Sequence, residues 1–209
     1  LKFIRDSQER PPIFFQYLRK IIEWSGHLMM EKAKTIYNSI QRDWQSSGPM
    51  TKEASEVFRS LVKATIGRCE VILNSLISES FFLLKIPNKS QLYATEVFEL
   101  LKTIAQLSPS YLSTILSGIA EFLNQSYSPN IQDLSLDSIK FMLHYCKIED
   151  HLSFIKRCLN SILQRPQQRF RDKATYLLNE ANSVTRSQSI GKLISDFSLV
   201  NNKQNRMQP

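Results

Sequence analysis

The sequence predicts an all-α protein. Its 209 residues include 5 glycines and 8 prolines, and most of these lie at the edges of apolar stretches. Inside the stretches, apolar residues recur at intervals of three and four, which is the spacing of one face of an α-helix. The strict alternation of apolar and polar residues that is typical of a half-buried strand is almost missing. Together these observations indicate helices joined by short connections.

The first helices are expected between the proline pair at 11–12 and Trp44. The preceding residues, 1–10, are polar and charged, and we expect them to form a leader. The prolines favour the first turn of a helix, where a missing N–H costs nothing. The Ser-Gly pair at 25–26 predicts a bend or break in the apolar pattern. The Ser-Ser-Gly-Pro segment at 46–49 is the clearest predicted loop.

A long apolar stripe follows between Thr51 and Leu84. Thr51 is expected to cap its first helix, because a threonine hydroxyl accepts a hydrogen bond from an unpaired N–H of the first turn. Gly67, in the middle of the stripe, predicts a kink or a close helix crossing. Ser90 and the Ser-Pro pair at 108–109 predict the starts of two further helices.

The next boundaries are marked by proline and by capping residues. The Ser-Pro-Asn segment at 128–130 predicts a turn, and a shorter helix is expected to start at Ser135 or Asp137. Asp150 is expected to cap another helix. The Arg-Pro pair at 165–166 predicts the boundary before the last helix of the folded part.

We therefore expect a leader over 1–10, one helical-repeat domain over 11–182 and a polar tail over 183–209. The tail is rich in Ser, Asn and Gln, and it contains a short amphipathic helix at about 188–200. About eight or nine helices with short connections pack antiparallel as hairpins. Stacked hairpins form a short α-solenoid, in which each repeat buries its face against its neighbours. An irregular helical bundle is the alternative.

Positive charge is concentrated at the two ends of the chain. The chain contains 27 Lys and Arg and 19 Asp and Glu, for a net charge of +8. Residues 1–49 contain 8 basic and 5 acidic groups, residues 50–164 contain 11 of each, and residues 165–209 contain 8 and 3. A surface that tracks a polyanion usually spreads its positive charge along one continuous face. The charged ends could instead steer an acidic partner or keep the protein soluble.

The cysteines and the apolar runs indicate the compartment. Cys69, Cys146 and Cys158 form no CxxC pair and no even framework, which predicts free thiols in a reducing compartment. Every apolar run is far shorter than the roughly 20 residues of a membrane span, and the N-terminus has no signal-peptide pattern. We expect an intracellular protein with no membrane partner.

The sequence contains none of the common catalytic motifs: it has no P-loop, GxSxG, HExxH or GxGxxG. His144 and Cys146 are two residues apart on a predicted helix, so their side chains point in different directions and do not form a metal site. We expect no catalytic, cofactor or metal site. An enzyme would need a constellation assembled from distant residues.

Two apolar clusters are candidates for protein binding. One is the stripe of the polar tail, which consists of Ile190, Leu193, Ile194 and Phe197. This stripe either packs on the domain as a last helix or docks into a partner. The other cluster contains Phe14 and Phe15 and has the same two interpretations, because an end repeat with two apolar faces requires a lid or a partner.

A basic run is the sharpest polar cluster: Arg165, Arg169, Arg171 and Lys173. A spacing of four puts Arg165 and Arg169 on one helix face, which Lys173 extends by a turn. This face could hold phosphates or an acidic partner helix, and the alternative is a solvated outer face. No aromatic residues interleave with it as single-strand binding favours, and Phe170 is expected to point inward.

Two segments resemble known helical-repeat families. The segment 166–181, with Arg171-Asp172 ahead of Ala174 and Leu177, resembles the second helix of a HEAT repeat. The segment 11–24 (PPIFFQYLRKIIEW) and the hairpins after it resemble the Nse6-like domain of adaptors with a SUMO-interacting motif, which recruit the SMC-type SUMO-ligase complex. This resemblance implies a nuclear scaffold for chromosome maintenance that pairs with a second helical subunit and does no catalysis. It transfers no functional residue.

The function expected from the sequence is therefore a non-enzymatic helical scaffold or adaptor that binds another protein subunit and needs no cofactor. The alternative is a basic α-solenoid that binds nucleic acid directly.

Overall fold

The computed structural model describes the backbone of residues 10–46, 48–87, 90–123 and 127–204, and side chains up to residue 186. The regular structure of these residues is helical, and they contain no strand. The predicted all-α class is confirmed.

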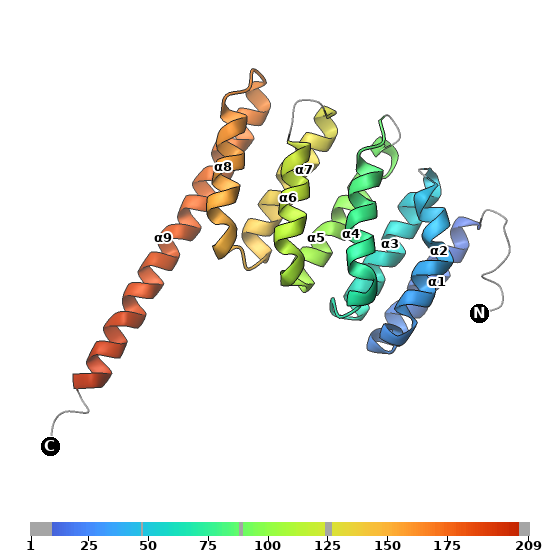
Figure 1. The fold of residues 1–209 in the computed structure, drawn as a ribbon, viewed down its shortest axis with the longest axis horizontal. Helices are drawn as coiled ribbons and strands as arrows, with labels where there is room; N and C mark the ends of the chain where they lie inside the picture. The colour runs from blue at the N-terminus through green and yellow to red at the C-terminus, as the bar shows by residue number, and fades with distance from the viewer. Residues whose placement is uncertain (1–9, 47, 88–89, 124–126, 205–209) are drawn as a thin grey trace. The chain divides into compact units, whose positions relative to one another are not determined.

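The chain forms two compact units, residues 1–147 and residues 148–209, where the sequence led us to expect one domain over 11–182. The helices of the first unit, shown in Figure 1, are α1 (Pro12–Ser25), the 3-10 helix η2 (Gly26–Lys32), α2 (Ala33–Gln45), α3 (Pro49–Ala64), α4 (Glu70–Leu84), η3 (Ser90–Leu92), α5 (Ala94–Leu107), η4 (Pro109–Tyr111), α6 (Leu112–Phe122) and α7 (Pro129–Tyr145). Those of the second unit are η5 (Glu149–His151), α8 (Leu152–Leu163) and α9 (Gln168–Gln204).

One α-helix begins where the sequence predicts, at the proline pair 11–12, and two others begin at prolines that the sequence predicts to lie in a loop or a turn. Pro12, Pro49 and Pro129 lie in the first turns of α1, α3 and α7, where the fixed φ of proline suits the helix. Thr51 caps α3 from inside the helix, because its Oγ1 accepts a hydrogen bond from the Gly48 N–H at 3.1 Å. The predicted break at 25–26 is confirmed, because α1 ends at Ser25.

Three predicted starts differ from the structure. The helix α7 begins at Pro129, earlier than Ser135 or Asp137, because the Ser128 hydroxyl accepts from the Ile131 N–H at 3.4 Å and turns the expected loop into a cap. Ser90 begins the 3-10 turn η3, and α5 starts after it. Asp150 lies inside η5, so it is too early in the chain to cap α8.

The last helix is longer than expected. The helix α9 runs without interruption from Gln168 to Gln204, across the predicted junction between the domain and its tail. Ser, Asn and Gln have only modestly lower helix propensity than alanine, so a run of them weakens a helix without ending it. The predicted apolar stripe of the tail lies on this helix but outside the residues whose side chains are described: Ile190, Leu193, Ile194 and Phe197.

The helices of the first unit follow a regular order of contact. The helix α3 packs against α1 on one side and α5 on the other, and α5 also packs against α7. The helix α2 contacts α3 and α4, and Figure 1 shows these helices side by side. Trp44 is fully buried against the edge of the Phe58 ring, with the ring centroids 4.9 Å apart. Its indole N–H donates to the Ser55 hydroxyl at 2.9 Å, which satisfies the one polar atom of the buried ring.

Two glycines allow close approaches in this unit. Gly67 has a φ of +68° and lies in the turn that divides the predicted stripe into α3 and α4, and a Cβ there would lie 2.6 Å from the Leu107 carbonyl oxygen. The Ser108 hydroxyl donates to the Gly67 carbonyl at 2.8 Å. On α6, a Cβ at Gly118 would lie 2.6 Å from a ring carbon of Phe81. The missing side chain therefore lets α4 place an aromatic ring directly on α6.

In the second unit, α8 packs against α9. The buried apolar positions of α8 recur at intervals of three and four: Leu152, Ile155, Leu159 and Ile162. The buried positions of α9 in the described part are Phe170, Ala174, Leu177 and Ala181. Phe170 therefore points inward, as the sequence predicts.

Candidate protein-binding surface

The helix α1 is apolar on two opposite sides. Phe15 and Ile22 are fully buried on the side that packs against α3. The opposite side has apolar residues at intervals of four, four and three, whose exposed fractions lie between 51% and 86%: Ile13, Tyr17, Ile21 and Trp24. We call these four residues the α1 outer face. A contiguous exposed apolar patch of this kind is typical of an interaction site.

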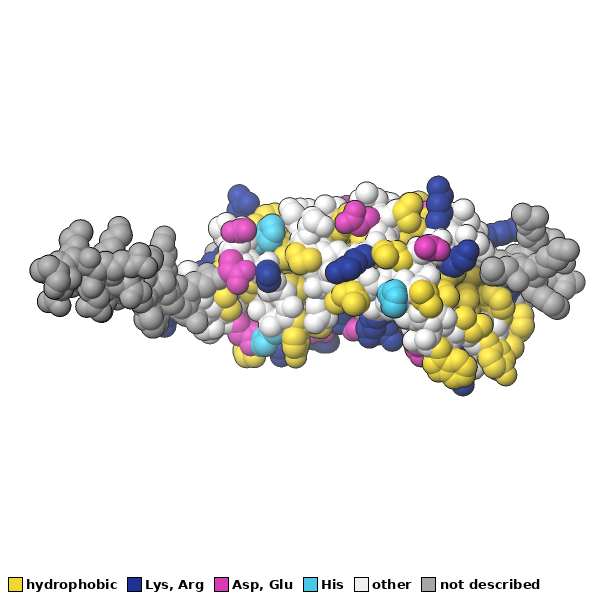
Figure 2. Space-filling view, turned by 90° about the horizontal axis from the view of Figure 1, so that it is seen from below, with side chains coloured by type: hydrophobic (Ala, Val, Ile, Leu, Met, Phe, Trp, Pro, Cys, Tyr) yellow, Lys and Arg dark blue, Asp and Glu magenta, His cyan; other side chains and the backbone are white. Residues whose placement is uncertain are grey.

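The apolar surface continues beyond α1. Leu28 and Met30 of η2 are also exposed, and they follow directly in the chain. Figure 2 shows hydrophobic side chains gathered at the end of the first unit that lies nearest the N-terminus. Exposed apolar side chains are therefore present on both α1 and η2.

A comparison of burial along the unit explains this exposure. The helix α3 buries eight of its 16 residues and α5 eight of its 14, whereas α1 buries two of its 14. Both α3 and α5 have a helix packed on each side, and α1 has its main helical contact with α3 alone. In the described part of the chain, α1 therefore has one apolar side that no helix covers, although its composition suits a helix with two neighbours.

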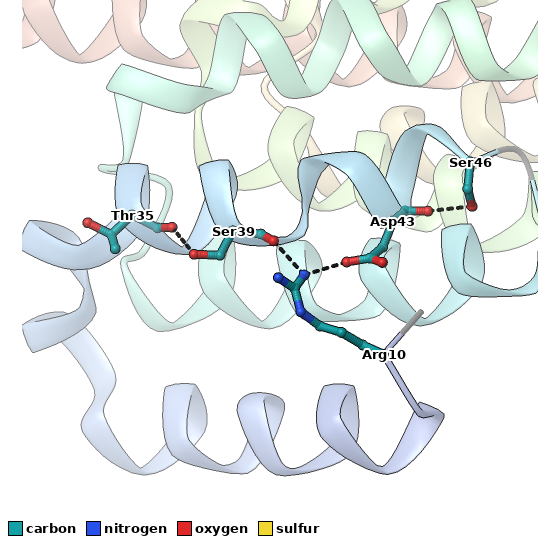
Figure 3. A network of polar contacts seen from close by, with 5 residues as sticks. All are labelled: Arg10, Thr35, Ser39, Asp43 and Ser46. Carbon is teal, nitrogen blue, oxygen red and sulfur yellow. Dashed lines mark hydrogen bonds and ion pairs between the residues drawn. The ribbon is translucent and has the colours of Figure 1, made fainter. Parts of the chain in front are cut away.

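Polar contacts hold α1 in place without covering the outer face. The Arg10 guanidinium donates to the Ser39 carbonyl oxygen and to the Asp43 carboxylate of α2, both at 2.5 Å (Figure 3). The same guanidinium lies over the Phe14 ring, 5.3 Å from its centroid. Arg19 forms an ion pair with Glu56 of α3. These contacts fix the start and the middle of α1 on its two neighbours.

The two phenylalanines predicted as binding residues are not part of the α1 outer face. Phe15 is fully buried, so it is a core residue and is not available to a partner in the folded chain. Phe14 is half-buried and is partly covered by Arg10. At 100° per residue, Ile13 and Tyr17 lie on the side of the helix opposite Phe15. Apolar residues occur all round α1 in the sequence, and this pattern was the signal for the outer face. The prediction of binding residues named only Phe14 and Phe15.

The predicted basic run is divided by the structure. Arg165 lies in the turn before α9, which begins at Gln168, so it does not share a helix face with Arg169. Arg171 donates to the Arg165 carbonyl oxygen at 2.8 Å and to the Gln168 side chain, so it stabilises this turn. Burial lowers the pKa of Arg165. Arg169 and Lys173 remain as a pair one turn apart on α9.

Three features of the described residues bear on the predicted chemistry: the thiols, the possible metal ligands and the helix lengths. The thiols of Cys69, Cys146 and Cys158 are free, and burial raises the pKa of each, that of Cys146 to about 11. No group of three or more His, Cys, Asp or Glu is placed to hold a metal ion in the described part. Among the helices that could be searched there, none is long and apolar enough to span a membrane.

Comparison of the chain with protein-family models, with curated proteins and with solved structures finds no match.

Proposed function

We propose that this protein is a non-enzymatic helical scaffold that binds another protein subunit through the α1 outer face. The observation that carries the proposal is the double-sided apolar character of α1, with Phe15 and Ile22 buried and the outer face exposed. An apolar helix side contributes to stability only when another surface covers it. Binding of this kind requires no cofactor.

The size of the surface suits protein binding. Full burial of a large apolar side chain contributes roughly 1.5 to 3 kcal/mol. Association costs roughly 4 to 15 kcal/mol in lost freedom, so a handful of such side chains can supply the balance. Trp24 is 86% exposed, and buried Trp is among the residues that most often dominate the energy of an interface. We therefore assign Trp24 as the anchor.

The contact order of the helices supports a finer architecture as part of the proposal. The row from α1 through α3 and α5 to α7, with α2 and α4 beside it, matches hairpins stacked in a short α-solenoid. In such a stack a hairpin buries both of its sides against neighbours, and the α1 outer face is a side that no described helix covers. The partner would then extend the row.

The cellular setting is also a proposal. The resemblance of segment 11–24 to Nse6-like domains favours a nuclear chromosome-maintenance complex and a second helical chain as the partner. Direct binding of nucleic acid has less support, because Arg171 of the predicted basic run is engaged in the turn before α9.

The test is co-purification from cells with a double variant, Ile21→Ser with Trp24→Ser. We expect a stoichiometric partner to co-purify with the wild type and to be lost from this variant, with far-UV circular dichroism unchanged because both side chains are exposed. The matched control is Val71→Ser with Phe82→Ser on α4, where the two side chains are 62% and 64% exposed. Retention of the partner by the α1 variant, or equal loss from the α4 variant, would refute the proposal.

A further inference from the structure

We infer that the segment bound at the α1 outer face is an amphipathic helix of a different chain, with acidic residues beside its apolar stripe. This inference rests on the proposed function and adds the chemistry of the partner. It follows from the shape of the face, from the charges beside it and from the symmetry of a possible self-association.

The shape of the face favours a helix. Apolar side chains spaced by four, four and three residues form a ridge along α1, and a partner helix accommodates such a ridge in the groove between its own side chains. The helices α1, α3 and α5 already pack beside one another in this unit. A helix laid on the outer face would take the same relation to α1 that α1 has to α3.

The charge beside the face favours acidic residues. Lys20 lies three residues after Tyr17 and four before Trp24, so it borders the outer face, and it is exposed. Lys20 forms no ion pair in the described part of the chain, and Glu23, the acidic residue of α1, accepts a hydrogen bond from the Ser60 hydroxyl of α3 at 3.1 Å. Arg10 and Arg19 are already paired with Asp43 and Glu56. Lys20 is therefore the charge of α1 that borders the outer face and is left for a partner.

The same charge disfavours a second copy of this chain. An antiparallel pair of α1 helices would place Ile13 opposite Trp24 and Tyr17 opposite Ile21, which suits their sizes. A two-fold axis, however, brings the same edge of both helices together. Lys20 would then face Lys20 of the other copy, and like charges that are brought close together repel. The charge therefore selects a partner of opposite sign over self-association.

Trp24 provides a direct reporter for the test. The chain contains two tryptophans, and Trp44 is fully buried whereas Trp24 is the most exposed apolar side chain of the face. The probes are three synthetic helical peptides that share one leucine stripe, contain no Trp, and have Glu, Gln or Lys at the flanking positions. Burial of Trp24 by a peptide shifts its emission to shorter wavelength and protects it from acrylamide quenching.

We expect the Glu peptide to bind about tenfold more tightly than the Lys peptide at low salt, and the difference to shrink as salt screens the charges. Lys20→Glu should abolish or reverse the preference. Lys147→Glu makes the same change in net charge at an exposed position outside α1 and α2, and should leave the preference intact. Trp24→Ala, whose binding is measured by isothermal titration calorimetry because it lacks the reporter, should weaken the Glu peptide by about thirtyfold, as loss of an interface anchor does.

Equal binding of the three peptides, or no change in Trp24 emission with the Glu peptide, would overturn the inference. So would a concentration-dependent dimer of the wild type that Trp24→Ser abolishes in analytical ultracentrifugation, since a second copy would then be the occupant. The co-purification experiment does not depend on the charge of the partner. A partner that is lost from the α1 double variant while the peptides show no charge preference would leave the proposed function standing and remove only this inference.

Discussion

Gly67 illustrates, at the scale of one residue, how backbone conformation and packing combine. Its φ of +68° lies in the left-handed region, and a Cβ would meet the Leu107 carbonyl oxygen at 2.6 Å. We predict that Gly67→Ala lowers the free energy of unfolding by about 3 kcal/mol or more. Roughly 1 to 2 kcal/mol comes from the left-handed backbone, and the rest from displacement of the backbone at the end of α5. Urea unfolding followed by circular dichroism measures the change.

Gly26 is the matched control for this prediction. Its φ of +55° is also positive, but a Cβ there would have nothing within 4 Å. Gly26→Ala should therefore cost only a backbone term, roughly 1 to 3 kcal/mol, with no packing term. A loss in Gly67→Ala that does not exceed the loss in Gly26→Ala would contradict the prediction.

At the scale of elements, a buried tyrosine joins α2 to α4. The Tyr37 hydroxyl donates to Glu79 Oε1 at 2.7 Å, and Gln41 donates to the same oxygen at 2.9 Å. Burial raises the pKa of Tyr37 above its ordinary value of 10, and the hydrogen bond and charge of Glu79 raise it further. The folded state therefore keeps the phenol protonated at a pH where the unfolded chain releases the proton.

This shift has a definite sign for stability. A pKa that is higher in the folded state contributes stability that is complete below pH 10 and is lost as the pH rises above it. We predict that Tyr37→Phe costs about 1 to 2 kcal/mol at pH 7, because the Glu79 carboxylate loses a donor, and that the variant loses less stability than the wild type between pH 9 and about 11. Urea unfolding of the wild type and the variant at pH 7, pH 9 and about pH 11 measures both effects. Tyr145→Phe, which removes an exposed phenol, is the control; a slope unchanged by Tyr37→Phe would contradict the prediction.

The elements also show what the sequence could predict. The proline pair 11–12 and the Ser25-Gly26 break predicted the two ends of α1, because these residues act through local geometry that needs no tertiary contact. The end of α3 was harder to predict, because a glycine at position 67 is compatible with either a kink or a turn. Only the close approach of α5 distinguishes the two. The outer face of α1 was missed for a similar reason: which apolar side faces the core depends on where α3 lies.

At the scale of the whole molecule, the division into two units has no mark in the sequence. The boundary between residues 147 and 148 lies in a short connection, Cys146-Lys147-Ile148, which contains no glycine or proline. Composition therefore predicts one continuous domain, whereas the boundary follows from how contacts group in space. The first unit contains both tryptophans and the entire α1 outer face.

This division predicts that a chain ending at Lys147 folds on its own. Within residues 1–147, α5 is buried against α3 and α7, and α7 also packs against α6. We expect the fragment to be helical by circular dichroism, to unfold cooperatively and to keep the short-wavelength emission of buried Trp44. A shorter chain that ends at Leu107 removes α6 and α7 and exposes the side of α5 that packs against them, where the Phe98 ring meets the Phe122 ring, so it should unfold without cooperativity or aggregate. If the two fragments behave alike, the contacts that define the first unit do not make it an independent folding unit.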